Sequence, residues 1–167
     1  MARPRPTSGQ PPDAAGLAFL LSQVGAHSAA RFAERLEPLG FKPSHAGILR
    51  VIRQSDGLSQ QALGERLGMF PSRLVGMIDE LEKRGLVERR NSPADRRSYA
   101  LHLTAAGRDA LERIGKVSRE HQEAVGAALS ESERGQLAGF LRRIAAEQGL
   151  TPGVHPGFRT TGGGETT

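Results

Sequence analysis

The sequence predicts a mainly helical fold (α+β) with one small β-hairpin, and three observations in residues 58–103 lead to this prediction. First, two amphipathic segments with helical spacing are separated only by a short break that begins at Gly68. Second, two segments in which apolar and polar residues alternate, as in half-buried strands, follow them directly. Third, a basic hairpin joins these two strands. The expected helices are 59–67 and 71–84, the expected strands are 86–90 and 97–103, and the hairpin is 91–96.

Helix, tight turn, helix and basic hairpin is the order of a winged helix-turn-helix. In that motif the second helix enters a groove of DNA and the hairpin, called the wing, enters the groove beside it. Local signals agree with it. Ser59 can cap the first helix by accepting from a free backbone N–H. Pro71 suits the first turn of the second helix, and Gly85 suits the residue just past its end.

The second helix has two faces with different expected roles. Leu74, Ile78 and Leu81 recur at helical spacing and are expected to face a core. The other face, at the helix N-terminus, is the end that normally meets base edges in this motif. The residues expected there are Ser72, Arg73, Gly76 and Met77.

Four more helices are expected around this unit. A first helix covers about 13–37, and a second begins near Pro43 or Ser44 and buries Ile48, Leu49 and Ile52. Thr104 caps a long helix to about Leu129. A Ser-x-x-Glu capping box then starts a last helix to about Gln148. Residues 1–12 and 149–167 are dominated by Gly, Pro, Ser and Thr, and we expect both to be disordered tails.

The domain is therefore expected to cover 13–148, with the DNA-binding unit at 43–103 and flanking helices at 13–37 and 104–148. Each flanking helix has an apolar stripe that a single copy of the chain cannot cover completely. Packing these helices against those of a second copy would bury the stripes and place two recognition helices side by side. A homodimer of this kind binds a pseudo-palindrome whose half-sites lie about one helical turn apart. The alternative is a monomer that folds these helices back on itself.

Composition limits the function classes. The 167 residues carry a formal net charge of +5 with a pI near 10.6, which suits a polyanionic partner such as DNA. The chain has no cysteine, which excludes disulfides, thiol redox switches and thiolate metal sites. No apolar run approaches the length of a membrane span, and no apolar segment typical of a secretory signal follows the basic N-terminus. We therefore expect no membrane partner and a cytoplasmic location.

The order of elements and three motifs resemble the MarR family of bacterial transcriptional regulators over about 14–146. The motifs are Leu58-Ser59-Gln60-Gln61-Ala62-Leu63, Leu81-Glu82-Lys83-Arg84-Gly85-Leu86-Val87, and Ala94-Asp95-Arg96-Arg97 leading to Leu101-His102-Leu103-Thr104-Ala105-Ala106-Gly107. The Asp-x-Arg of the wing followed by Leu-x-Leu-Thr-x-x-Gly is the most specific of them. The resemblance implies a DNA-binding regulator, most often a repressor, that acts as a homodimer on an operator. It also implies a location at the nucleoid of a bacterium.

The resemblance also implies roles for individual residues. Arg97 matches the wing arginine that enters the minor groove, where negative potential favours a guanidinium. Asp95 matches the acid that holds the wing, and Arg96 is expected to reach phosphate or solvent. Arg73 is suited to a bidentate contact with guanine, whereas Gly76 leaves a base-contacting position without a side chain. The complete set of expected DNA contacts is Ser59, Gln60, Ser72, Arg73, Gly76, Met77, Arg89, Arg90, Asp95, Arg96 and Arg97.

Members of the family often bind small aromatic or phenolic anions between the dimer helices and the DNA-binding lobe. The resemblance therefore implies a small-molecule effector in a cleft lined by the first, second and fifth helices, and release of DNA when it binds. Residues at that location are Phe19, Leu20, His27, Arg31, His45 and His121. Two alternatives stay open for the histidines: they are ordinary polar residues at a helix interface, or they titrate and couple DNA binding to acidity.

Other functions find little support in the sequence. The five histidines form no i, i+4 pair, so we expect no metal site and no cofactor. Enzyme motifs such as Gly-x-Ser-x-Gly and phosphate-binding loops are missing, so we expect no enzyme. A winged-helix module that binds a protein and not DNA remains the alternative function, although its docking face would be apolar or acidic and not basic. The sequence does not identify the operator, the regulated genes, the effector, or whether transcription is repressed or activated.

Overall fold

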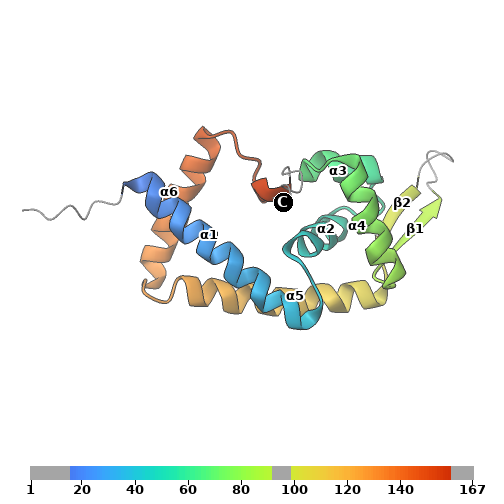
Figure 1. Ribbon diagram of the computed structural model, residues 1–167, viewed down its shortest axis with the longest axis horizontal. Coiled ribbons are helices and arrows are strands. Elements are labelled where there is room, and N and C mark those ends of the chain that lie inside the picture. The colour runs from blue at the N-terminus through green and yellow to red at the C-terminus, as the bar shows by residue number, and fades with distance from the viewer. Residues whose placement is uncertain (1–15, 92–98, 159–167) are drawn as a thin grey trace, which may run out of the picture.

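A computed structural model describes residues 16–91 and 99–158 of the chain. The described elements follow the order α1–η1–α2–α3–α4–β1–β2–α5–α6–η2 (Figure 1). Their bounds are α1 Leu17–Leu36, η1 Glu37–Leu39, α2 Pro43–Gln54, α3 Gln60–Leu67, α4 Pro71–Lys83, β1 Val87–Asn91, β2 Tyr99–Leu103, α5 Ala105–Val125, α6 Glu131–Glu147 and η2 Pro156–Phe158. The predicted mainly helical fold with a winged helix-turn-helix is confirmed, and the described helix and strand bounds lie close to those expected from the sequence.

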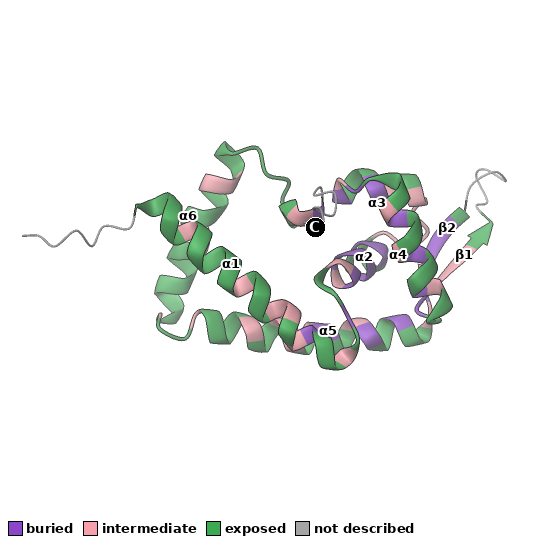
Figure 2. Ribbon diagram, viewed as in Figure 1, coloured by how far each residue is buried: buried purple, intermediate pink, exposed green. Residues whose placement is uncertain are grey.

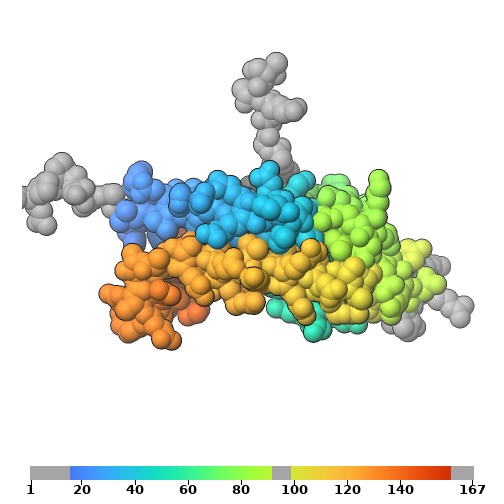
Figure 3. Space-filling view, turned by 90° about the horizontal axis from the view of Figure 1, so that it is seen from below, coloured from blue at the N-terminus to red at the C-terminus, as the bar shows by residue number. Residues whose placement is uncertain are grey.

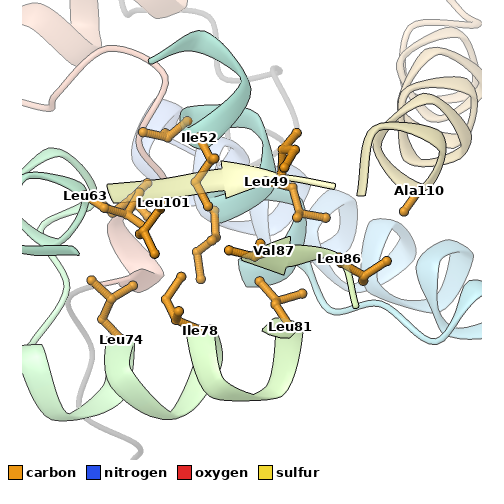
Figure 4. Close-up of a cluster of buried hydrophobic side chains, with 14 of the residues drawn as sticks. Leu49, Ile52, Leu63, Leu74, Ile78, Leu81, Leu86, Val87, Leu101 and Ala110 are labelled. Atoms are coloured by element: carbon orange, nitrogen blue, oxygen red, sulfur yellow. The ribbon is translucent and has the colours of Figure 1, made fainter. Parts of the chain in front are cut away.

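The hydrophobic core lies between α2, α3, α4 and the two-stranded sheet. The apolar stripe of α4 points into it, as the sequence spacing predicts, and meets Leu63 of α3 and Leu101 of β2 (Figure 4). Strands β1 and β2 pair antiparallel, with Val87 opposite Leu103. Because three helices and the sheet share this core, α4 is held rigidly on its inner face while its outer face stays free for a partner.

The helix ends follow the sequence signals. The hydroxyl of Ser59 accepts from the backbone N–H of Ala62 at 3.1 Å, which caps α3. Gly68 ends this helix in the left-handed conformation with φ of 61°. The Ser130 side chain and the Glu133 carboxylate form the expected capping box at the start of α6. These caps fix where each helix begins and therefore which face it presents.

Helix α5 connects the DNA-binding unit to the other end of the molecule. It packs along α1, and the two helices lie side by side in Figure 3. The first turn of α5 lies very close to the residue that precedes β1. A Cβ on Gly107 would be only 2.0 Å from the carbonyl oxygen of Leu86. Thr104 caps the helix and also donates to the carbonyl of Gly85 at 2.6 Å. The start of α5 is therefore fixed to the end of the α4–β1 turn.

The N-terminal part of α1, the C-terminal part of α5 and the whole of α6 are mostly exposed (Figure 2). No residue of α6 is buried, although the helix has a clear apolar stripe. The large apolar side chains that remain exposed on these three helices are Leu17, Phe19, Leu20, Val24, Val125, Leu137, Phe140 and Leu141. The single chain does not cover these stripes, as the sequence analysis expects.

The segment after α6 differs from the disordered tail expected at 149–167. From Gly149 to Phe158 it returns from α6 to the DNA-binding unit and ends in η2 beside α2 (Figure 1). Phe158 is only 7% exposed and belongs to the core cluster. The polar composition of the segment conceals this contact, because one aromatic side chain and two arginine contacts hold it. Residues 159–167 of the expected tail, and the tail at 1–12, lie outside the described residues.

Candidate nucleic-acid interface and the cleft behind it

The N-terminal end of α4 presents the residues expected to meet base edges. Ser72 and Gly76 are exposed, and no atom lies within 4 Å of a Cβ built on Gly76. Met77, in contrast, is half-buried and packs against the core. On α3, Ser59 is half-buried and its hydroxyl serves as the helix cap. The surface open to a groove at these positions is therefore formed mainly by Ser72 and Gly76.

Arg89 lies inside a network that joins three elements. Its guanidinium donates to Asp79 of α4 at 2.6 Å, to Glu82 of the same helix, and to Gln60 of α3 at 3.3 Å. Burial lowers the pKa of Arg89, but the hydrogen bond to Asp79 and the charge of Glu82 raise it overall. This geometry favours a structural role, in which Arg89 fixes the sheet against α3 and α4. Its expected contact with phosphate stays a prediction.

Arg90 is more accessible. Its guanidinium pairs with Glu88 on the same strand, and its side chain is 61% exposed. The next positions of the wing, including Asp95, Arg96 and Arg97, lie outside the described residues, so their expected roles stay predictions. Strand β1 lies at the end of the molecule away from α6 (Figure 1).

A cleft of about 1070 Å³ lies behind α4, between the DNA-binding unit and the terminal helices. Its walls come from α1, α2, α5 and α6 and from the C-terminal segment. Ile114 and Leu111 of α5 and Phe32 of α1 supply apolar surface. Three arginines also line it: Arg50 of α2, Arg73 of α4 and Arg142 of α6. An apolar cavity with a few cationic groups at defined places suits a small aromatic anion.

The first, second and fifth helices, where an effector cleft is expected from the sequence, all contribute to the walls of this cleft. The six candidate side chains, however, do not line it. Phe19, Leu20, His27 and Arg31 are exposed on α1, and Arg31 pairs with Glu34. The arginines of α2, α4 and α6 that do line the cleft were missed as ligand-binding candidates. Spacing along one helix could not identify them, because the cleft walls depend on how the helices cross.

His45 is a buried core residue and not part of the cleft. Its Nδ1 accepts from the backbone N–H of Lys42 at 3.3 Å and so caps α2. Its Nε2 lies 3.4 Å from the Glu80 carboxylate but without the geometry of a hydrogen bond. Burial lowers the pKa of His45, and the charge of Glu80 only partly offsets this effect.

His121 joins α5 to α1. Its Nε2 lies 3.1 Å from the Ser28 hydroxyl, and its ring lies 5.3 Å from that of Phe32. Burial, followed by the charges of Arg35 and Arg31, lowers the pKa of His121. This placement agrees with the alternative in which the histidine is an ordinary polar residue at a helix interface.

Within residues 16–91 and 99–158 the structure contains neither a candidate metal cluster nor a candidate membrane-spanning helix. No cluster of three or more His, Cys, Asp or Glu side chains that could hold a metal ion is found there. Over the same residues, no helix combines the length and apolar character needed to cross a membrane.

Residues 39–98 match the model of the MarR family. A protein of Thauera aromatica, named as a candidate transcriptional regulatory protein for the hcr operon, is 40% identical over 113 residues, which cover 68% of each chain. The chain belongs to the MarR family. The resemblance noted from the sequence motifs is thereby confirmed.

Two further proteins resemble the chain over most of its length. The transcriptional repressor Rv2887 of Mycobacterium tuberculosis is 30% identical over 135 residues, covering 81% of this chain and 97% of that protein. Its complex with DNA has a TM-score of 0.68 to this structure. The repressor CouR bound to a 23-mer DNA duplex has a TM-score of 0.71 at 30% identity, covering 78% of this chain and 92% of that chain. The chain is therefore a DNA-binding transcriptional regulator and not an enzyme.

Proposed function

We propose that this regulator is a homodimeric repressor that binds a pseudo-palindromic operator and releases it when a small aromatic anion enters the cleft. The observation that carries the proposal is the position of Arg73. It lies on the expected recognition helix α4 and at the same time lines the cleft. A ligand that attracts this guanidinium would change the DNA-binding surface directly.

For the DNA contacts we propose two groups. Ser72 and Arg73, at the N-terminus of α4, enter the major groove, and Arg73 recognises guanine in a bidentate contact. Arg97 of the wing enters the minor groove, and Arg90 and Arg96 contact phosphates. The exposed N-terminal face of α4 and the exposed Arg90 support this assignment. The repressor names of the relatives support a repressing action.

For the dimer we propose that the exposed stripes of α1, α5 and α6 pack against those of a second copy. Phe140 and Leu137 of α6 and Phe19 of α1 would be buried there. Large apolar side chains gathered on a surface commonly mark an interface between proteins. A two-fold axis through this end would place both α4 helices on one side of the dimer, where each can meet one half-site.

The first experiment is a titration of the purified chain against the DNA upstream of its own gene, at two salt concentrations. Tight binding at a pseudo-palindrome that weakens steeply with salt is the expected result. The variants Arg73→Ala and Arg97→Ala separate the two groups of contacts. Arg73→Ala should cost about 1–3 kcal/mol on the operator and relax sequence preference. Arg97→Ala should weaken binding strongly while the dimer stays intact.

The ligand part of the proposal has its own test. Benzoate and its hydroxylated forms, added to the preformed complex, should release DNA at lower concentrations than cyclohexane carboxylate of equal charge. Arg142→Gln removes the cation that α6 contributes to the cleft wall and should weaken the effect of the aromatic acid without changing operator affinity. Sequence-blind binding in the first experiment would contradict the DNA part. An operator complex insensitive to all these acids would contradict only the ligand class.

A further inference from the structure

The C-terminal segment, residues 149–158, forms one wall of the cleft and contacts α4, the expected recognition helix. The Nη1 atom of Arg73 donates to the carbonyl oxygens of Gly157 at 3.3 Å and of Phe158 at 3.4 Å. Arg50 donates to the carbonyl of Gly153. Two of the three arginines that line the cleft are therefore held by backbone carbonyls of the chain's own C-terminal segment.

The segment is anchored by a socket made for one aromatic ring. Phe158 lies against Gly47 of α2, and a Cβ added to this glycine would be 2.5 Å from the ring atom Cζ. Gly47 is in the middle of a helix, where glycine is less favourable than alanine, and its backbone has no left-handed conformation that would require glycine. The lack of a side chain at this position therefore has a local use, which is to admit the ring.

Apart from this ring and the contacts with Arg50 and Arg73, little surface of the segment is buried. Leu150 and most residues from Thr151 to Pro156 are exposed, with Val154 only partly buried. Its internal hydrogen bonds are few: Val154 to Thr151, Phe158 to His155, and the N–H of Gly157 to the His155 ring. A segment with one buried side chain and an exposed backbone belongs to the least stable part of a fold and can open without global unfolding.

We propose that this segment is an autoinhibitory strap, which competes with DNA for Arg73 and must leave before the operator is bound tightly. A bidentate contact with guanine needs two guanidinium N–H groups in one plane, aimed at the base edge. While Nη1 donates to Gly157 and Phe158, the guanidinium of Arg73 is held at the cleft and is not aimed at a base edge beyond the exposed face of α4. This inference rests on the proposed DNA contact of Arg73.

The strap and an aromatic ligand need not act alike. The ring of Phe158 fills the place over Gly47, so a ligand that takes this place would displace the strap, whereas a ligand elsewhere in the cleft could hold it closed. The strap itself needs no ligand to act. Its effect should therefore be measurable with the purified protein and operator DNA alone.

Three variants and one control test the strap by binding of a fluorescent operator duplex. Phe158→Ala removes the anchor, Gly47→Ala closes the socket from the other side, and a chain ending at Gln148 lacks the whole segment. Each should tighten operator binding about tenfold if the open form is about a tenth of the population, because apparent affinity scales with the competent fraction. A chain ending at Arg159 keeps the strap and should bind like the full chain.

Two combinations show whether the effect passes through the proposed contacts. The double variant Gly47→Ala, Phe158→Ala should bind the operator no more tightly than either single variant, since both changes remove the ring from the same socket. In an Arg73→Ala background, Phe158→Ala should give no gain. Unchanged or weaker binding by folded Phe158→Ala and Gly47→Ala would overturn the proposal. Because both are single substitutions, they keep the test decisive if the truncated chain does not fold.

Amide hydrogen exchange provides a separate measurement. Adding operator to the full chain should increase exchange in residues 150–158, and no increase in a fully formed complex would overturn the strap. If the full chain and every variant fail to bind any operator, the proposed function fails instead. Even then, residues 150–158 can be compared without DNA. Faster amide exchange in Phe158→Ala than in the unchanged chain would show that the ring holds the segment in place.

Discussion

The two ends of the molecule are built on different principles. Around α4 and the sheet, apolar side chains such as Ile52, Leu63 and Ile78 have no exposed surface at all. At the other end, α6 has an equally regular stripe with no buried residue, and Phe140 is 55% exposed. One end is thus complete within a single chain, whereas the other has its apolar surface ready for a partner.

This difference shows that folding and assembly depend on different parts of the chain. Burial of the α4 stripe fixes the helix whose outer face is to meet DNA. The open stripes of α1 and α6 contribute little to a lone chain and would contribute fully only in a dimer, where their area is removed from water. Substitutions at the two ends should therefore affect different properties, folding at one end and assembly at the other.

The largest effect on folding is expected from Ile78→Ala. Removing this fully buried side chain leaves a cavity in the core between α4 and the sheet, at a cost of about 2–5 kcal/mol in the free energy of unfolding. Val75→Ala, on the exposed face of the same helix, provides the matched control and should change stability by no more than about 0.5 kcal/mol. Urea unfolding measures both. Equal losses would show that the core is not where the structure places it.

The complementary change at the other end is Phe140→Asp. A charge in the middle of the proposed interface should separate the dimer, because an unpaired charge is costly to bury. The core should stay folded, since this side chain does not contribute to it. Sedimentation velocity measures the mass, and thermal unfolding the fold. Gly135→Asp adds the same group to α6 where nothing lies within 4 Å, and should leave the mass unchanged. A Phe140→Asp chain with unchanged mass would move the interface elsewhere.

The features that the sequence predicted correctly are local ones. The Ser59 cap and the Ser130 capping box join residues three positions apart, so the sequence spacing determines them. The stripe of α4 likewise follows from helical periodicity. The unexpected features depend on distant residues. Phe158 belongs to the core only because Gly47 leaves room for its ring, and no local pattern in a polar segment reveals that partner.

The cleft proposed for a ligand shows the same limit at a finer level. The first, second and fifth helices all contribute to it, yet Arg50 and Arg73 line it and His45 does not. Which side of a helix faces the cleft depends on the angles at which the helices cross and on the segment 149–158, which comes back from α6 to α2. The spacing of residues along one helix does not encode either of these. Arg89 is similar, because its basic character suggested phosphate, whereas Asp79 and Glu82 of α4 surround it in the fold.

A smaller effect is expected when either of the neighbouring arginines of β1, Arg89 or Arg90, is replaced by alanine. Arg89→Ala removes the bonds to Asp79 and Glu82 and should cost about 1 kcal/mol of stability, since both carboxylates remain partly exposed to water. Arg90→Ala should hardly change stability, but should reduce operator affinity and the salt dependence of binding by about one phosphate contact. Urea unfolding and DNA titrations at several salt concentrations separate the two roles. The reverse pattern would make Arg89 the phosphate contact.

The smallest effect is a pH dependence of the free energy of unfolding, which arises at His45 in the buried core. Burial lowers the pKa of His45 from its ordinary 6.5, so the folded chain binds fewer protons there than the unfolded chain does. Stability should therefore be full above about pH 6.5 and decrease as the pH falls below it, because protonation then favours the unfolded state. Glu80 opposes this loss, and Arg84 and Lys42 add to it.

Unfolding in urea at pH 7.5 and pH 5.5 measures this difference, and His45→Gln should reduce it. Its amide can still accept from the Lys42 backbone N–H, so the helix cap is kept while the titration is removed. His27→Gln, at an exposed position on α1, is the control and should leave the difference unchanged. The lowered pKa of His121 acts in the same direction, so part of the dependence should persist in His45→Gln. A dependence wholly retained by His45→Gln but lost in His121→Asn would place acid sensitivity at the α1–α5 contact, beside the proposed dimer interface and not in the core.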